Sequence, residues 1–255
     1  MCPDMAMDRP PRAPFDNDLA PAELRRLLEI MKQLRAPDGC PWDQIQTFNT
    51  IVPYTIEEAY EVADAIGRDH KADLRDELGD LLLQVVYYAQ MAAEEGSFDF
   101  ADVARSVADK MVDRHPHVFG TDAVRSADLQ IREWEIGKAK ERAGRGESGV
   151  LAGVPATLPA LTRALKLTRR AGRVGFDWSN AALILEKLDE ETAELRSELS
   201  SADPVRLADE VGDMLFVVAN LARKLDLDPE ACLRGSNSKF ERRFGSMERA
   251  LAQQG

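Results

Sequence analysis

The chain has 255 residues, of which 31% are charged and 44% are hydrophobic, and its formal net charge is −12. Because acidic residues outnumber basic ones, this composition argues against a nucleic acid as the main partner. No apolar run approaches the roughly twenty residues that a membrane-spanning helix needs, so we expect no membrane partner either.

The N-terminal residues and the cysteines predict a cytoplasmic protein. Residues 1–20 are rich in Pro and Asp, lack the apolar core of a signal peptide and are expected to form a disordered tail. The three cysteines are few, odd in number and scattered, which suits a reducing compartment better than a disulfide framework.

Every element predicted after the tail is a helix. Apolar residues from Leu24 to Leu34 recur with helical period, between Pro21 and the turn signal at 36–39. Residues 40–43 are predicted to be irregular. The first acidic helix is predicted to start near Tyr54. The other predicted helices cover about residues 71–95, 99–113, 129–142, 157–172, 181–200, 204–225 and 229–250. Since no strand pattern appears, we predict an all-α fold.

One acidic motif occurs twice, with an offset of 133 residues. The first copy consists of Glu57, Glu58, Glu61, Glu77 and Asp80, and the second of Glu190, Glu191, Glu194, Glu210 and Asp213. The match extends to apolar neighbours such as Leu82 and Leu215. This duplication predicts two copies of one helical unit. We expect an N-terminal domain over 21–142, a linker over 143–156 and a C-terminal domain over 157–255.

The spacing of the acids indicates metal binding. Residues three and four apart share one helix face, so each copy carries acidic faces on two helices. If these faces oppose each other, about four carboxylates converge, and they repel one another unless they protonate or bind cations. Mg²⁺ uses a few carboxylates and leaves positions for water and phosphates. The alternative is a solvated acidic face, against which the duplication argues. A di-iron site would need Glu-x-x-His pairs, which none of the three histidines forms.

Further motifs flank the acids and carry a family resemblance. They are Gly39-Cys40-Pro41-Trp42-Asp43, Arg114-His115-Pro116-His117-Val118-Phe119, the segment from Gly153 to Leu161, and Arg173-Val174-Gly175-Phe176-Asp177-Trp178. With them, nearly the whole chain after the tail resembles the MazG family of nucleoside triphosphate pyrophosphohydrolases. Dimeric dUTPases and phosphoribosyl-ATP pyrophosphohydrolases share the acidic plan, but the flanking motifs favour MazG.

The resemblance implies two tandem MazG-like helical bundles that form a homodimer. It implies Mg²⁺-dependent hydrolysis of NTPs and dNTPs, with broad base specificity and Mn²⁺ as a substitute ion, to monophosphate and pyrophosphate. Such an activity suits house-cleaning of the nucleotide pool. The implied metal ligands are Glu191, Glu194, Glu210 and Asp213 in the second half, and Glu58, Glu61, Glu77 and Asp80 in the first. Glu190 and Glu57 lie beside these ligands and are the candidates for orienting or deprotonating the attacking water. The sequence does not assign the general base.

Basic residues are expected to bind the triphosphate beside the metal. The candidates are Lys187, Lys239, Arg242 and Arg243 in the second half, and Lys110, Arg114 and His115 in the first. The first half also has Trp134 and Lys138 after its motif, and the resemblance implies that such a late Trp stacks on the nucleotide base. The alternatives are a solvated basic helix end for the cluster at 239–243 and the cap of a helix or turn for His115 and His117. Tyr54 stands where the second half has Lys187. We therefore favour the second half as the principal site, although it has no counterpart of Trp134 and Lys138 before Gly255. The first half could be a second site, a differently selective one or a dimerisation module.

A function of another class remains open at this stage. The same helical units could form a nucleotide-sensing or protein-interaction module without turnover. Retention of all the acids in both halves argues against this alternative, and release of pyrophosphate distinguishes the two.

Overall fold

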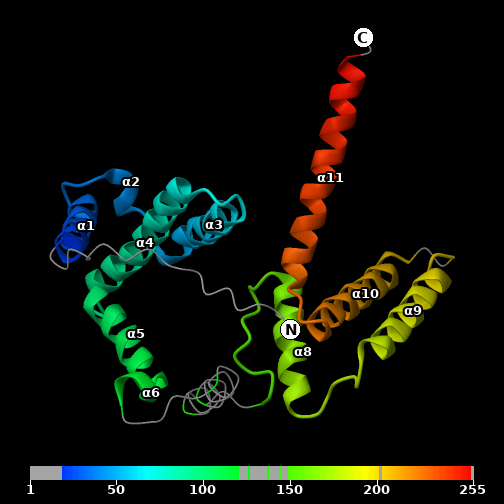
Figure 1. Cartoon of the computed structure of the whole chain (residues 1–255). Helices are drawn as coiled ribbons and strands as arrows, with labels where there is room; N and C mark the ends of the chain where they lie inside the picture. The colour runs from blue at the N-terminus through cyan, green and yellow to red at the C-terminus, as the bar shows by residue number, and fades with distance from the viewer. Residues whose placement is uncertain are drawn as a thin grey trace. The chain divides into compact units, whose positions relative to one another are not determined.

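The computed structural model describes residues 19–120, 149–200 and 203–253, together with Ser126, Gly137 and Gly144. Within this part of the chain every regular element is a helix, so the all-α prediction is confirmed (Figure 1). The chain divides into two compact units, residues 1–125 and 126–255. The predicted domain and linker boundaries remain a prediction. No helix in the described ranges is long and apolar enough to cross a bilayer.

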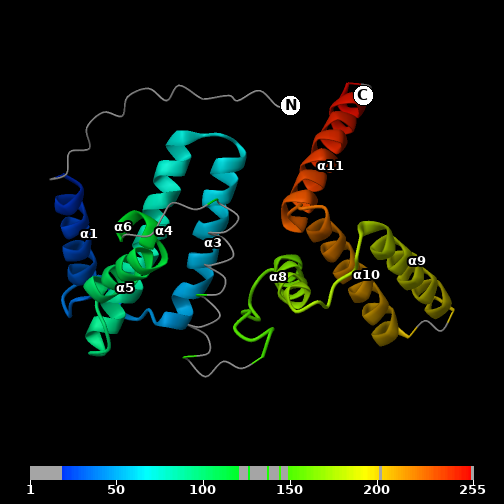
Figure 2. The same cartoon turned by 60° about the horizontal axis from the view of Figure 1, so that its bottom comes forward.

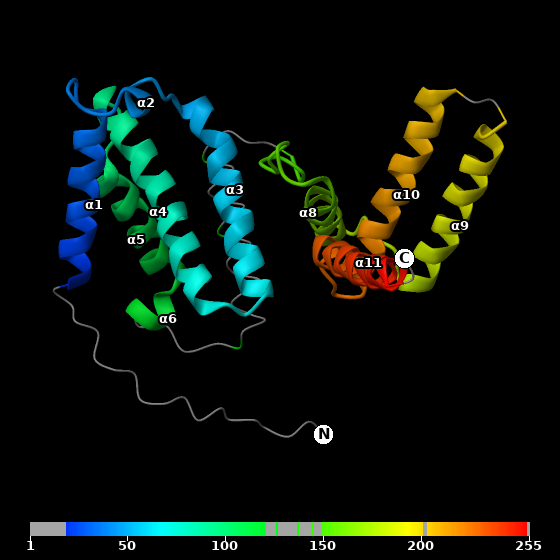
Figure 3. The same cartoon turned by 90° about the horizontal axis from the view of Figure 1, so that it is seen from above.

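Unit 1 is built around an antiparallel helix hairpin. Its helices are α1 (Leu19–Arg35), α2 (Pro41–Gln44), α3 (Phe48–Gly67), α4 (Lys71–Glu94), α5 (Phe100–Arg114) and α6 (Pro116–Phe119). Helices α3 and α4 lie side by side as the hairpin, and α1 packs against α4 (Figures 2 and 3). Helix α5 starts beside the C-terminal half of α4 and runs away from it (Figure 1).

Local sequence fixes both ends of the hairpin. Thr47 and Thr50 form a capping box that starts α3, six residues earlier than the predicted start near Tyr54. The connection to α4 is tight because Asp69 adopts a left-handed conformation with φ of 52°. His70 then caps α4, with its Nδ1 accepting the Asp73 backbone N–H at 3.3 Å.

The segment predicted to be irregular contains the short helix α2 and anchors α1 to α4. Asp43 in α2 is buried. The Tyr87 hydroxyl of α4 donates to the backbone and side-chain oxygens of Asp43, at 2.9 Å each. Arg35 of α1 donates to the Asp43 carbonyl at 2.6 Å and pairs with Glu94 at 2.6 Å. Burial and the bond to Asp43 raise the pKa of Tyr87 to about 12, so its hydroxyl keeps its proton. Tyr87 and Met31 belong to the hydrophobic core beneath this network.

Unit 2 repeats the hairpin. Its helices are α8 (Ala160–Arg173), α9 (Ala181–Glu198), α10 (Pro204–Lys224) and α11 (Pro229–Ala252). Helices α9 and α10 form the hairpin, and α10 packs against α8 (Figure 3). Helix α11 contacts α8 and α10, and Pro229 at its start is its one buried residue. The rest of α11 runs away from the other helices of the unit (Figure 1).

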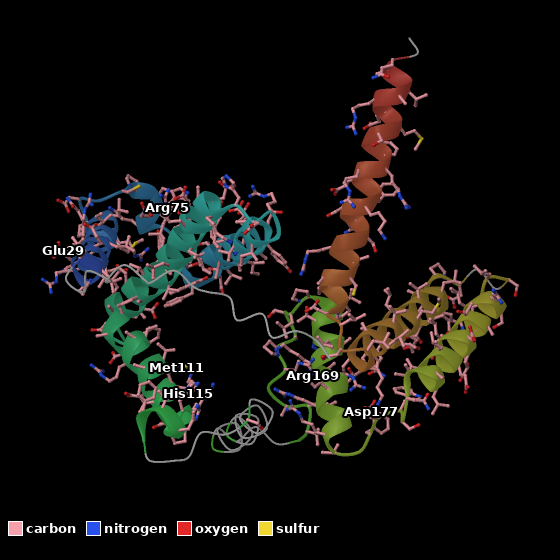
Figure 4. The ribbon with its side chains drawn as sticks, in the orientation of Figure 1. Glu29, Arg75, Met111, His115, Arg169 and Asp177 are labelled. Carbon is pink, nitrogen blue, oxygen red and sulfur yellow. The ribbon has the colours of Figure 1, made fainter. Side chains whose placement is uncertain are left out.

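An aspartate also ties the first helix of unit 2 to its hairpin. Asp177 follows α8 (Figure 4) and forms ion pairs with Arg223 and with Lys224, the latter at 3.1 Å. Burial raises the pKa of Asp177, but the hydrogen bonds from Arg223 and Lys224 outweigh this effect and hold the pKa below its usual value. Lys224 also donates to the carbonyl of Trp178 at 2.5 Å. The two units thus share a plan in which an aspartate after the first helix binds the last turns of the hairpin.

The other predicted helices lie within a few residues of α1, α4, α5 and α8 to α11. The short helix α6 was not predicted. The predicted helix over 129–142 falls outside the described residues, apart from Gly137.

Candidate metal centres

Each hairpin brings three carboxylates of the duplicated motif together. In unit 1, Glu58 of α3 meets Glu77 and Asp80 of α4, and one oxygen of each lies within 4.8 Å of the other two. In unit 2, Glu191 and Glu194 of α9 meet Glu210 of α10 within the same limit. We call these sets acid centre 1 and acid centre 2. Carboxylate oxygens are the hard donors that Mg²⁺ and similar cations bind, so the donor set fits a divalent cation.

The fourth acid of each predicted set lies beside its centre. The Glu61 carboxyl group interacts with those of Glu58 and Glu77. Asp213 is exposed and adds its charge to the field at Glu210.

Mutual repulsion marks both centres. Burial and the charges of Asp80 and Glu61 raise the pKa of Glu58. Burial and the charge of Glu61 likewise raise the pKa of Glu77. In acid centre 2, burial and the charge of Glu194 raise the pKa of Glu210. A bound cation would relieve this repulsion, which is why such clusters favour metal.

Lys187 distinguishes acid centre 2 from acid centre 1. Its Nζ lies 2.8 Å from oxygens of both Glu190 and Glu191. The Glu191 side chain is only 6% exposed, so this ion pair sits at the edge of the core. In unit 1 the equivalent residue is Tyr54, whose ring packs edge-on against Trp42 with centroids 6.2 Å apart. Acid centre 2 therefore has a built-in ammonium beside its acids.

The predicted water-orienting acids lie next to the centres and outside the groups of three. Glu57 is exposed on α3, one residue before Glu58. Glu190 is exposed and bonded to Lys187 at 2.8 Å.

The basic residues predicted downstream are not brought to either centre within a unit. Lys239, Arg242 and Arg243 are exposed on the part of α11 that leaves the bundle (Figure 1). Sequence spacing placed them after the acids but could not show that their helix departs from the hairpin.

The same holds for the basic residues of unit 1. Lys110, Arg114 and His115 lie near the end of α5, whereas acid centre 1 uses the first turns of α4. His115 ends α5, and its Nδ1–H donates to the carbonyl of Met111 at 2.6 Å (Figure 4). This geometry is that of a helix cap. Trp134 and Lys138 lie outside the described residues.

Sequence reasoning missed a cavity in unit 2. Its volume is about 220 Å³ and it lies between α8, α10 and the segment that follows α8. The lining residues are Leu151, Leu167, Thr168, Ala171, Phe176, Asp177, Trp178, Phe216, Asn220 and Arg223. The sequence does contain a signal, because the offset of 133 aligns Asn220 with the large Tyr87.

Comparison with known proteins places both centres in one family. The family model described as the MazG nucleotide pyrophosphohydrolase domain matches residues 46–119 and 180–246, which include acid centres 1 and 2. A nucleoside triphosphate pyrophosphohydrolase of Escherichia coli is 48% identical over 236 residues, covering 91% of this chain and 90% of that protein. A Thermotoga maritima protein, nucleoside triphosphate pyrophosphohydrolase/pyrophosphatase MazG, is 42% identical over 229 residues, covering 90% of this chain and 87% of that protein.

Proposed function

Because the chain belongs to the MazG family and is a nucleoside triphosphate pyrophosphohydrolase, we propose that it works with Mg²⁺ held by its acid centres. The observation that carries this proposal is the convergence of three carboxylates in each hairpin. Mn²⁺, another hard cation with oxygen preference, is the expected substitute. The proposed ligands are Glu191, Glu194, Glu210 and Asp213, and in unit 1 Glu58, Glu61, Glu77 and Asp80.

When bound, such an ion lowers the pKa of a coordinated water and offsets charge on the pyrophosphate leaving group. The protein supplies the rest. Glu190 is held by Lys187 at the edge of acid centre 2, where its carboxylate can accept a proton from the attacking water. Glu57 has the equivalent place in unit 1.

Lys187 is the proposed phosphate contact of acid centre 2. Its ammonium already lies between two carboxylates, so a metal ion that engages Glu191 frees the ammonium for a phosphate oxygen. Unit 1 has Tyr54 at this place and lacks that charge. We therefore propose acid centre 2 as the principal site and acid centre 1 as a weaker or differently selective one.

We propose a homodimer. Helix α11 exposes Phe240, Phe244, Met247 and Leu251, each by 48% or more. Their spacing of four, three and four residues forms one apolar stripe, as in helices that pack against another helix. A second copy is the natural cover, and in the dimer Lys239, Arg242 and Arg243 reach the triphosphate. Light scattering at micromolar concentration should give about twice the 28.3 kDa mass of the chain; the mass of a single chain would refute this assembly.

Pyrophosphate and monophosphate release from NTPs and dNTPs tests the function. Glu191→Gln should abolish most turnover, Glu58→Gln should leave most of it, and the double variant should be inactive. The reverse pattern would move the principal site to unit 1. Binding of Mg²⁺ and NTP without pyrophosphate release by the wild type would instead establish the non-catalytic sensing module.

We further propose that the enzyme accepts nucleotides with many different bases. It would act in the cytoplasm, in house-cleaning of the nucleotide pool. Phosphate contacts and stacking tolerate many bases.

A further inference from the structure

Lys187 already holds one of the oxygens that a metal ion would use at acid centre 2. Its ammonium lies 2.8 Å from a carboxylate oxygen of Glu191, and Glu191 belongs to the group of three converging acids. The Glu191 side chain is only 6% exposed, so little water reaches this carboxylate. A buried carboxylate needs a charged or hydrogen-bonding partner. In the metal-free chain Lys187 supplies that partner.

The geometry of α9 also fixes the position of the ammonium. Lys187, Glu191 and Glu194 follow one another at spacings of four and three residues, so they share one face of the helix. Glu190 holds the same ammonium from the other side, at 2.8 Å. An ion bound by the acids would thus be a neighbour of the ammonium, and the two positive charges would repel each other. Metal binding at acid centre 2 must therefore displace Lys187 or bear this repulsion.

Unit 1 has the same acids without such a base. Tyr54 takes the place of Lys187, and its ring packs edge-on against Trp42. The basic side chains around the hairpin turn pair with aspartates outside acid centre 1, namely Arg68 with Asp64 and Asp73, Lys71 with Asp69, and Arg75 with Asp76. An ion that enters acid centre 1 therefore displaces none of these bases.

We propose that Lys187 makes metal binding at acid centre 2 depend on the nucleotide, whereas acid centre 1 binds its ion without one. Without nucleotide, a cation at acid centre 2 competes with the ammonium for the oxygen of Glu191. One hydrogen bond between charged groups corresponds to about ten- to hundredfold in affinity. Acid centre 2 should bind a free divalent ion more weakly than acid centre 1 by about this factor. This inference rests on the function proposed above.

The triphosphate removes the competition. Its oxygens accept hydrogen bonds from the ammonium, and they also coordinate Mg²⁺. The nucleotide thus gives Lys187 a new partner and leaves the Glu191 oxygen to the ion. Because coupling between two ligands is reciprocal, the ion raises the affinity for the nucleotide by the same factor. The ion of acid centre 2 therefore arrives with the substrate, and the ion of acid centre 1 is resident.

Titration of the full chain with Mn²⁺, followed by the electron paramagnetic resonance signal of the free ion, tests this inference without turnover. The wild type should show a tighter class of ions, which Glu58→Gln removes, and a weaker class, which Glu191→Gln removes. Lys187→Met should tighten the weaker class by about ten- to hundredfold, because the competing ammonium is gone. Lys187→Arg keeps a positive charge and should leave this class weak.

The reciprocal exchange in unit 1 decides the question if loss of Lys187 unfolds unit 2. Tyr54 is 40% exposed, so a lysine fits there, one helical turn before Glu58. Tyr54→Lys should weaken Mn²⁺ binding at acid centre 1 by about tenfold or more. Tyr54→Met is the matched control, since it removes the ring and adds no charge, and its affinity should equal that of the wild type.

The nucleotide dependence is tested with an NTP analogue that carries a methylene bridge between the α and β phosphates. Equilibrium dialysis at a Mn²⁺ concentration between the two dissociation constants should show acid centre 1 filled and acid centre 2 empty. Addition of the analogue should fill acid centre 2 in the wild type and fail to do so in Glu191→Gln. Equal affinities of the two centres, or unchanged affinities in Lys187→Met and Tyr54→Lys, would overturn this inference and leave the hydrolase intact. Absence of Mn²⁺ from both centres would overturn the proposed role of the acids as well.

Discussion

Glu58→Gln should make the metal-free protein more stable, although it removes a proposed metal ligand. Glu58 faces Glu77 and Asp80 in acid centre 1, with oxygens within 4.8 Å of each other. Unlike Glu191, it has no lysine one turn earlier, because Tyr54 stands there. Neutralising Glu58 thus removes repulsion and breaks no ion pair within the part of the chain that the structure describes.

The size of the effect follows from the geometry. Two carboxylate charges at the outer limit of 4.8 Å repel by about 0.9 kcal/mol at the dielectric constant of water. We expect Glu58→Gln to raise the free energy of unfolding of unit 1 by about 1 kcal/mol in EDTA at pH 7, or Tm by about 4 °C. Metal at a hundred times its Kd adds about 2.7 kcal/mol to the wild type. A hundredfold loss of affinity in the variant would cut this gain to about 0.4 kcal/mol.

In EDTA the Glu58→Gln variant should therefore be more stable than the wild type, whereas in saturating Mg²⁺ the wild type should be the more stable of the two. Calorimetric melts of wild type, Glu58→Gln and Glu191→Gln measure this directly. Glu57→Gln is the control, since it removes a charge from the same helix outside the group of three. Because Glu191 pairs with Lys187, its substitution should give no gain in EDTA. Equal stability of Glu58→Gln and wild type in EDTA, or an equal gain from Mg²⁺, would refute the repulsion argument.

Three further outcomes are expected. In EDTA the stability advantage of Glu58→Gln should be absent below about pH 4 and should grow toward neutral pH. The reason is that the pKa of Glu58 is raised in the folded protein, so the stability of the wild type falls as this carboxyl group ionises. Thermal melts across this pH range measure the difference. Tyr87→Phe should cost unit 1 about 1–3 kcal/mol in urea denaturation, because the buried side-chain oxygen of Asp43 loses its donor, whereas the Asp43 carbonyl keeps its hydrogen bond from Arg35. Lys187→Met should raise KM for NTPs tenfold or more, without loss of Mg²⁺ affinity, because one charge-assisted contact to the triphosphate is lost; an unchanged KM would remove Lys187 from the phosphate site.

The sequence predicted what depends on local pattern. Helical period and turn signals located the hairpins, and the spacing of Glu58, Glu77 and Asp80 indicated that their carboxylates would meet. The direction of α11 depends on tertiary packing, so the distance of Lys239 from the acids could not be foreseen. The alignment of Asn220 with Tyr87 was the only sequence signal of the cavity, and it was not sufficient, because only the packed neighbours show whether a smaller side chain leaves space.

The isolation of α11 within its unit has a consequence for proteolysis. In this helix of 24 residues Pro229, in the first turn, is the buried residue, and helices in proteins gain most of their stability from packing of an apolar face. Its ordering therefore depends on whatever covers its apolar stripe. Trypsin cleaves the peptide bonds that follow Lys and Arg, such as Lys239, Arg242 and Arg243. Cleavage at these bonds therefore reports that the helix is uncovered. Dilution that separates two copies would then release the C-terminal residues, and nucleotide that holds the basic side chains would protect them.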